Sequence, residues 1–270
     1  MKKFLKVLYM VLILLFMYAP IFTLVVYSFF DVNTVSFQDL LVTPFSLELY
    51  KKLFTDSALM KIVFDTLLLA LIVAVLSVIL GTTGAIGIFY SKKRAGKTLS
   101  AVSRIPVINA EIVTAVSIAL LFTAIFTQSR SFFAMIIGHM VLTTPFVVLS
   151  VLPKLQQMDP NMYEAALDLG ASPTRALWTV VIPEILPGIV SGFMLAITLS
   201  LDDYIVSAYT QPAGIKTIST YVYTAISKSG TNSSLPALRA LSAIIFVVIT
   251  AVVIINNVVS NKKAKKEVKA

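Results

Sequence analysis

Three carboxylates lie in stretches of this chain that are otherwise almost entirely apolar. Asp202 and Asp203 stand together in the sequence Ser-Leu-Asp-Asp-Tyr-Ile, and Glu111 stands in Asn-Ala-Glu-Ile-Val-Thr. Carboxylates within membrane-spanning segments are costly and usually face a cavity or pair with a partner. Tyr204 follows the two aspartates, and an aromatic face can hold a cation by cation–π attraction. Acids in two separate segments, beside an aromatic ring, favour an elongated polycation over an anion as the bound molecule.

The two aspartates cannot both face the same path squarely. Neighbouring residues on a helix project about 100° apart. We therefore expect one of Asp202 and Asp203 to line a path and the other to pair sideways or lie near the outer surface, without the sequence deciding which. The alternative is that these acids pair with a partner protein and never meet a substrate.

A second group of residues forms a compact polar stretch, 159–183, which we call the elbow. Its pattern predicts two short helices, because it holds two cap-and-proline starts and a glycine suited to a left-handed helix end. These signals are Asp159–Pro160, Gly170 and Ser172–Pro173. Pro183 is expected to break the second helix. Ala165 and Ala166 are small enough to let another surface approach, so the elbow is either a docking element for a partner protein or a well-capped connector.

The composition shows what must position these residues. Hydrophobic residues make up 58% of the 270 residues and charged residues 13%, with a mean hydropathy of +0.92. Soluble domains carry about 25% charged residues, so the composition indicates an integral membrane protein. The chain has no cysteine and one histidine, His139, which argues against disulfides and metal clusters. The net charge of +9 does not indicate nucleic-acid binding, because Lys and Arg gather in short loops and the tail.

The hydrophobic pattern predicts an all-α, single-domain membrane protein spanning residues 1–270, with six transmembrane helices. The expected spans are 7–30, 62–90, 105–126, 131–152, 184–209 and 237–259. We expect Ser91–Arg104 to be a basic loop, and Gly81, Gly84 and Gly87 to mark close helix packing. His139 is expected to be a satisfied packing residue, the alternative being a proton relay. Lys and Arg are more frequent on the side that holds both termini and the elbow, which places that side in the cytoplasm.

The elbow also resembles a known motif. Glu164-Ala165-Ala166, followed by Gly170 and by Val180-x-Ile182-Pro183, is similar to the "EAA" loop of ABC-importer permeases. That family usually ends the motif Ile-x-Leu-Pro, so Val180 and Ile182 are mild departures. The resemblance implies a type I importer fold, in which the elbow is a coupling helix that sits in a cleft of a cytoplasmic ATPase. The residues that it assigns to ATPase coupling are Glu164, Ala165, Ala166, Asp168 and Gly170.

Other stretches resemble one branch of that family. The segments around Glu111, His139 and Asp202, together with the elbow, are similar to the second permease subunit of spermidine/putrescine importers over nearly the whole chain. The branch more often has Asp where Glu111 stands. The resemblance implies a bacterial inner-membrane complex with a second permease as heterodimer partner, two ATPase subunits and an extracytoplasmic substrate-binding protein. ATP and Mg would bind the ATPase subunits, and this chain would bind no cofactor. The residues expected on a polyamine path are Asp202, Asp203, Glu111 and Tyr204.

Two other functions stay open at this stage. The same kind of permease could carry another cationic solute or a thiamine-like ring. A stand-alone secondary carrier would also use acids within the membrane, although no inverted repeat with paired broken spans is evident. An enzyme is not expected, because the sequence holds no nucleophile–base pair and no cluster of metal ligands.

Overall fold

The computed structural model describes residues 2–30, 43–127, 130–159, 161–228, 239–247 and 250. Two compact units are present. The first comprises Met1–Lys61 and Thr224–Ala270, and the second comprises Ile62–Tyr223. In the first unit, α1 (Lys2–Tyr27) is followed by a short turn whose Phe29 stacks on Phe45 at a centroid distance of 5.4 Å. The next helix of this unit is α3 (Glu48–Thr55).

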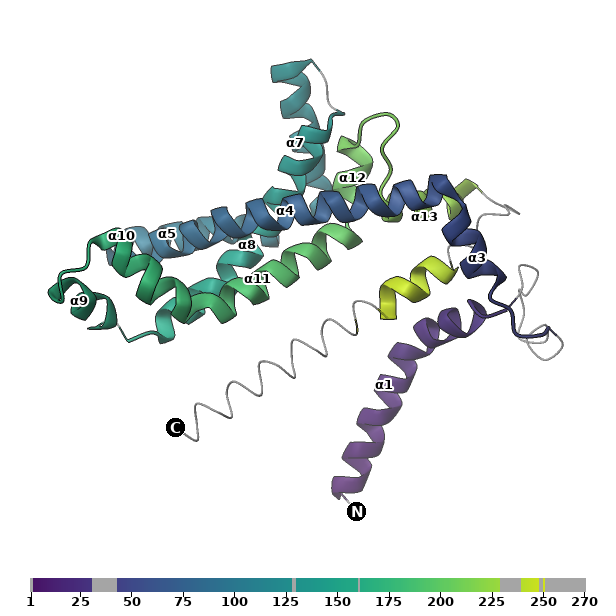
Figure 1. The fold of residues 1–270 in the computed structure, drawn as a ribbon, viewed down its shortest axis with the longest axis horizontal. Helices are drawn as coiled ribbons and strands as arrows, with labels where there is room; N and C mark the ends of the chain where they lie inside the picture. Colours follow the sequence, from purple (N-terminus) through teal and green to yellow (C-terminus); the bar gives the residue numbers. More distant parts are fainter. Residues whose placement is uncertain are drawn as a thin grey trace. The chain divides into compact units, whose positions relative to one another are not determined.

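The second unit carries the acids and the elbow (Figure 1). Its helices in chain order are α4 (Ser57–Tyr90, which begins in the first unit), α5 (Lys93–Ser103), α6 (Ile105–Ile108), α7 (Glu111–Phe126), α8 (Phe132–Gln157), α9 (Asn161–Asp168), α10 (Pro173–Ala176), the π-helical turn η1 (Leu177–Val181), α11 (Ile182–Asp202), α12 (Ile205–Thr210) and α13 (Ile218–Lys228, which ends in the first unit). Helix α8 packs against both α4 and α11, and its buried side is mostly apolar. The core there includes Val147, Val151, Leu155, Ile185 and Ala196.

Small residues let these three helices approach closely. A Cβ on Gly81 of α4 would lie 2.6 Å from Cβ of Val147, and one on Gly192 of α11 would lie 3.1 Å from the same side chain. The packing role predicted for Gly81 is therefore confirmed. It is wrong for Gly87, where a Cβ would meet nothing within 4 Å, and Gly84 makes only an ordinary contact at 3.9 Å. A repeat of three residues drifts around a helix of 3.6 residues per turn, so the last glycine leaves the contact.

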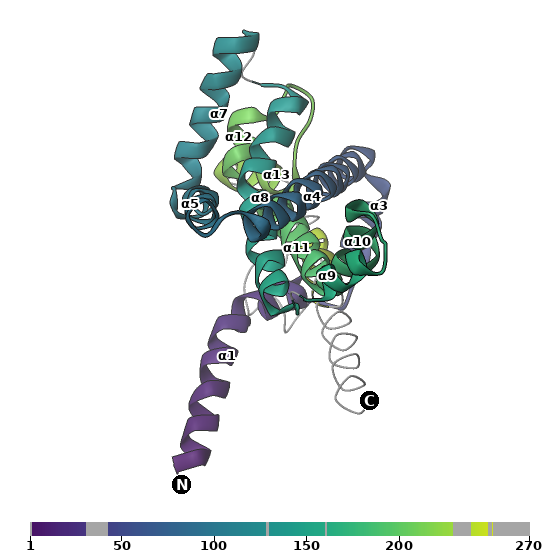
Figure 2. The ribbon, with the colours of Figure 1, turned by 90° about the vertical axis from the view of Figure 1, so that its left-hand side faces the viewer.

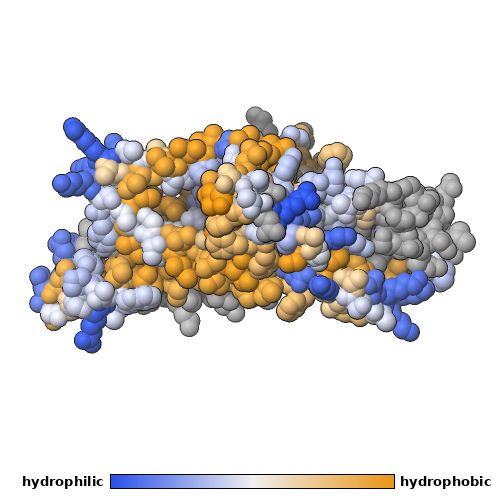
Figure 3. Space-filling model, turned by 90° about the horizontal axis from the view of Figure 1, so that it is seen from above, coloured by the Kyte–Doolittle hydropathy of each residue, from blue (hydrophilic) through white to orange (hydrophobic). Residues whose placement is uncertain are grey.

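Four helices in the described part of the chain are long and apolar enough to cross a membrane: Leu5–Tyr27, Ser57–Tyr90, Phe132–Gln157 and Pro173–Asp202. The bent pair Lys93–Ile108 and Glu111–Phe126 would make a fifth span if it crosses as one. The sixth predicted span, 237–259, lies mostly outside the described residues. Figure 3 shows hydrophobic side chains over the middle of the second unit and hydrophilic ones at the end that holds α9 and α10.

The third predicted span differs most from the structure. Residues 105–126 do not form one helix, because the chain is extended at Asn109 and Ala110 and turns by 98° there. In Figure 2, α5 is seen end-on while α7 stands upright. The predicted basic loop Ser91–Arg104 is also wrong, since most of it is helix α5. Basic and apolar residues alternate along α5 with a helical period, and counting its charges alone does not reveal that period.

The fifth predicted span begins too late and ends too late. One uninterrupted helical segment runs from Pro173 to Asp202, and we call it the rod. Pro183 does not break it, contrary to expectation. The π turn η1 precedes this proline, which sits in the first turn of α11. Wider π hydrogen bonding offers a way to accommodate a ring that has no N–H to donate.

Candidate functional site

The elbow is capped as its sequence predicts. Oδ1 of Asp159 accepts a hydrogen bond from the backbone N–H of Asn161 at 2.9 Å. Ser172 Oγ accepts from the N–H of Arg175 at 3.4 Å, and Pro173 takes the first helical position. Both helix starts of the elbow are thus set by side chains within three residues of the N–H groups that they satisfy.

Gly170 closes α9 in the left-handed conformation, with φ of +86°. Its N–H donates to the carbonyl of Leu167 at 2.9 Å, and the N–H of Ala171 donates to the carbonyl of Ala166 at 3.0 Å. These two bonds form a Schellman motif, which favours glycine because a side chain is strained at this φ.

The elbow presents its residues outward. No residue of α9 is buried. Glu164, Ala165, Asp168 and Gly170 are exposed, and Ala166 is half-buried. All five residues assigned to coupling therefore lie on or beside one short, accessible helix.

Sequence reasoning missed the apolar part of this surface. Leu169 is 90% exposed and Trp178 is 67% exposed. Large apolar side chains close to the charged residues of the elbow were the available signal, because exposed apolar groups beside polar ones mark interaction surfaces. Tyr163 holds the other side of α9 to the bundle, with its ring 5.4 Å from that of Tyr90.

The rod connects the elbow to the acidic pair. It has 30 residues, which at 1.5 Å per residue is about 45 Å. Ser172 caps its first turn, and Asp202 is its last residue. The two regions singled out from the sequence thus lie at opposite ends of one helical segment (Figure 1).

The two aspartates have different surroundings in the structure. Asp202 is exposed, whereas Asp203 is 6% exposed. Asp203 caps α12: its Oδ1 accepts from the N–H of Val206 at 3.2 Å and its Oδ2 from the N–H of Ser207 at 2.9 Å. The pairing expected for one member of the pair is therefore made by Asp203.

His139 of α8 lies beside that cap. Its Nε2 is 3.3 Å from Oδ2 of Asp203 and 3.0 Å from Oγ of Ser207, and its Nδ1 is 2.9 Å from Oγ of Ser200. His139, Ser200 and Ser207 are at most 1% exposed. The ring is thus fully buried with a partner for each nitrogen, as expected of a packing histidine.

The two other predicted path residues lie on different elements. Tyr204 is half-buried in the break between α11 and α12, with its ring centroid 4.2 Å from that of Tyr223. Glu111 is exposed in the first turn of α7, a helix that packs against α12. Among the described residues, no hydrogen bond or ion pair joins Glu111 to Asp202 or Asp203.

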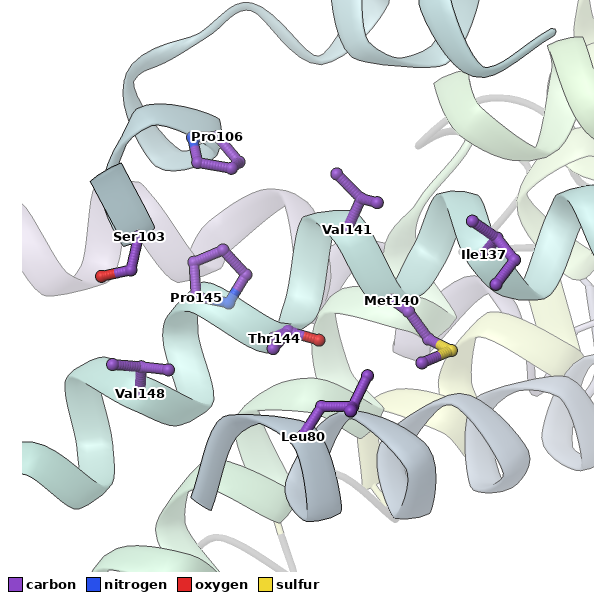
Figure 4. Close-up of a pocket in the computed structure, with 9 residues that line it drawn as sticks. All are labelled: Leu80, Ser103, Pro106, Ile137, Met140, Val141, Thr144, Pro145 and Val148. Atoms are coloured by element: carbon purple, nitrogen blue, oxygen red, sulfur yellow. The ribbon is translucent and has the colours of Figure 1, made fainter. Parts of the chain in front are cut away.

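An apolar pocket of about 380 Å³ lies elsewhere, beside Pro145 of α8 (Figure 4). It is lined by Leu80, Ser103, Pro106, Ile137, Met140, Val141, Thr144, Pro145 and Val148. None of these side chains is charged, so the pocket is separate from the carboxylates. Within the described ranges, no three His, Cys, Asp or Glu side chains gather as a metal site would require.

Comparison with solved structures identifies the fold. A bacterial alginate ABC transporter, crystallised in complex with an alginate pentasaccharide-bound periplasmic protein, matches with a TM-score of 0.67 and 17% identity, covering 97% of this chain and 94% of that chain. The MetNI methionine ABC transporter in an inward-facing conformation matches with a TM-score of 0.62 and 18% identity, covering 77% and 97%.

Comparison of sequences identifies relatives. The putrescine transport system permease protein PotI of Escherichia coli is 30% identical over 232 residues, covering 84% of this chain and 81% of the relative. The spermidine/putrescine transport system permease protein PotC of Haemophilus influenzae is 29% identical over 262 residues, covering 97% and 98%. Residues 78–265 match the family described as the inner membrane component of binding-protein-dependent transport systems. This chain therefore belongs to that family, the multi-pass inner-membrane permeases of bacterial ABC importers.

Proposed function

We propose that this chain is one of two different permease subunits in an ATP-driven importer of polyamines, with six spans and both termini in the cytoplasm. The observation that supports a polyamine as the cargo is the exposed carboxylate of Asp202. It lies at the end of a predominantly apolar rod, next to Tyr204 and its ring partner Tyr223. A carboxylate beside aromatic faces suits an amine cation. The names of the relatives, which are permeases for putrescine and for spermidine/putrescine, support the same cargo.

The elbow is the proposed contact with the ATPase. The permease has no catalytic role, and ATP binds the partner ATPase subunits. Glu164, Ala165, Ala166, Asp168 and Gly170 dock in a cleft of one ATPase, with Leu169 filling an apolar part of that cleft. Because the elbow continues into the rod, closure of the two ATPases moves the helix that ends at Asp202.

The path itself is formed together with the second permease. Asp202 and Tyr204 supply one cation-binding wall, and Glu111 supplies a carboxylate from α7. An extracytoplasmic binding protein delivers the polyamine, and the permease pair alternates between outward- and inward-facing states. Asp203 supports this wall through the α12 cap.

The second candidate cargo within this role is another cationic solute or a thiamine-like ring, since Asp202 and Tyr204 would attract these too. A stand-alone secondary carrier is wrong, because the chain belongs to a family of permease components that work with separate ATPases.

The test is ATP-dependent uptake of labelled spermidine by the full complex in proteoliposomes. We expect uptake by the wild type, competition by unlabelled putrescine, and strong loss in Asp202→Asn with ATPase subunits still bound. No spermidine uptake by the wild-type complex, under conditions where its ATPases turn over, would overturn the polyamine assignment.

A further inference from the structure

We propose that His139 is a positioning residue that clamps the break between α11 and α12 onto α8, so that α12 follows the rod when the elbow moves. The inference rests on the proposed function in one respect: it takes the rod to be driven by an ATPase at the elbow. It assigns to His139 and Asp203 a role distinct from contact with the cargo.

The first observation is that the clamp joins three helices through one side chain. The His139 ring on α8 meets Ser200 on α11 at 2.9 Å and Ser207 on α12 at 3.0 Å. These hydroxyls stand on either side of the break. A single ring therefore holds both halves of the broken helix to the same point on α8.

The second observation is that backbone groups at the break have hydrogen-bond partners other than His139. The N–H of Asp203 donates to the carbonyl of Leu199, and the hydroxyl of Ser219 donates to the carbonyl of Leu201. Asp203 itself receives two backbone N–H groups of α12. His139 is thus not needed to cap either helix end, and its contacts serve to fix position.

The third observation is the close approach of α12 to α8 one residue earlier. A Cβ on Gly138 would lie 2.5 Å from Cγ1 of Val206. The clamp and this contact hold the same turn of α12. Thr143, one turn further on, donates to the carbonyl of His139 and lies 2.7 Å from the Ser77 hydroxyl of α4. The buried hydrogen bonds therefore continue from His139 through Thr143 to Ser77 of α4.

These contacts predict a mechanical consequence. A chain break with no side contacts would let α12 swivel when the rod shifts, and the motion would be lost before it reached the outer segment. Buried hydrogen bonds are costly to leave unmade, so His139 keeps α11, α12 and α8 as one body.

This chain has no cysteine, so a cysteine introduced into it is the one labelling site of the permease, and the partner subunits are used in cysteine-free form. A single cysteine replaces the exposed Tyr209 of α12, and its rate of maleimide labelling is measured without nucleotide and with vanadate-trapped ATP. Four forms are compared in this background: His139, His139→Leu, His139→Gln and Ser200→Ala. The matched control is Ser191→Ala on an exposed face of α11, where the serine only bonds its own helix.

We expect the labelling rate to change with nucleotide state when His139 is present. In His139→Leu the ratio of the labelling rates with and without trapped nucleotide should fall about tenfold, while ATP hydrolysis continues. A tenfold change lies within the range of coupling energies measured for residues of one hydrogen-bond network. His139→Gln should restore part of it, Ser200→Ala should weaken it, and Ser191→Ala should leave it unchanged. His139→Leu complexes that assemble and keep the full nucleotide dependence would overturn the clamp.

The readout does not depend on the cargo. If the wild-type complex imports no polyamine but labelling responds to nucleotide through His139, the polyamine assignment fails and the clamp stands. If the response is present and identical in all four forms, the clamp fails and the polyamine assignment is untouched.

Discussion

The two ends of the rod are built in opposite ways. At the elbow, every bond that shapes the backbone joins residues close in sequence, such as Asp159 with Asn161 and Ser172 with Arg175. At the other end, His139 meets Ser200 and Ser207 across 61 and 68 residues. The residues bonded at the elbow are exposed, whereas His139, Ser200 and Ser207 are buried.

This difference is consistent with the roles proposed for the two ends. An element that docks into a separate protein must keep its shape while in water, so local caps and a glycine suffice. An element that lies among apolar helices has no water to satisfy its polar groups, so they must find partners on neighbouring helices. Exposed residues of the elbow can thus be changed without unfolding the bundle, whereas the buried group of His139, Ser200, Asp203 and Ser207 cannot.

The largest effect is expected at the exposed end. Glu164→Lys reverses the charge at position 164 of α9, and Gly170→Asp places a side chain at a φ of +86°. Each should abolish co-purification of the ATPase, while the permease stays in the membrane at normal amounts. Pull-down of the ATPase measures the effect, with Gly87→Ala, where a Cβ meets nothing, as the control. Normal ATP-driven transport by both elbow variants would contradict the coupling role.

The next effect concerns the exposed aspartate of the far end. Asp202→Asn removes a charge without changing size, and contacts to a charged group contribute about 1.5–3 kcal/mol. Uptake should fall by about tenfold or more, with assembly and thermal stability unchanged. The control is Asp203→Asn, which should lower stability as well, because that carboxylate is buried and paired. Equal stability of the two variants would remove the proposed division of roles.

A packing change sharpens the contrast further. Gly138→Val should destabilise the permease by about 1–3 kcal/mol, because its Cβ would meet Val206 at 2.5 Å. Gly84→Val, at an exposed position with an ordinary contact, is the matched control and should be near neutral. The midpoint of thermal unfolding in detergent measures both, and similar midpoints would show that the approach of α12 to α8 is not tight.

The smallest effect is expected from a single cap. Ser172→Ala removes the acceptor at the start of the rod, which typically costs about 1 kcal/mol. We expect slightly weaker ATPase binding and an unchanged unfolding midpoint, since Ser172 and the residues that follow it up to Arg175 are exposed. A lowered midpoint would mean that the elbow is part of the cooperative unit after all.

Much of the elbow could be predicted from its amino acids. Its caps and the left-handed Gly170 depend on residue types at short spacing, and the physics that acts on them is local. The membrane character followed from composition in the same way. The outer apolar residues Leu169 and Trp178 were missed, because sequence alone does not tell which side of a short helix faces the bundle.

Other features needed the tertiary structure. Periodicity predicted a straight third span, but the chain bends by 98° between α6 and α7, where α7 packs against α12. The sequence motif predicted that the helix would stop at Pro183. The rod instead continues through this residue, and a π turn precedes the proline.

By itself, the sequence determined that this is an all-helical membrane permease with a capped, charged elbow and a few acids in apolar surroundings. Only the tertiary structure decided that Asp203 is buried against His139 and that Asp202 is left exposed. The physical reason is that adjacent aspartates have the same chemistry and differ only in direction. Direction is set by where α11 ends and by which groups of α8 lie opposite, and those groups are more than sixty residues away.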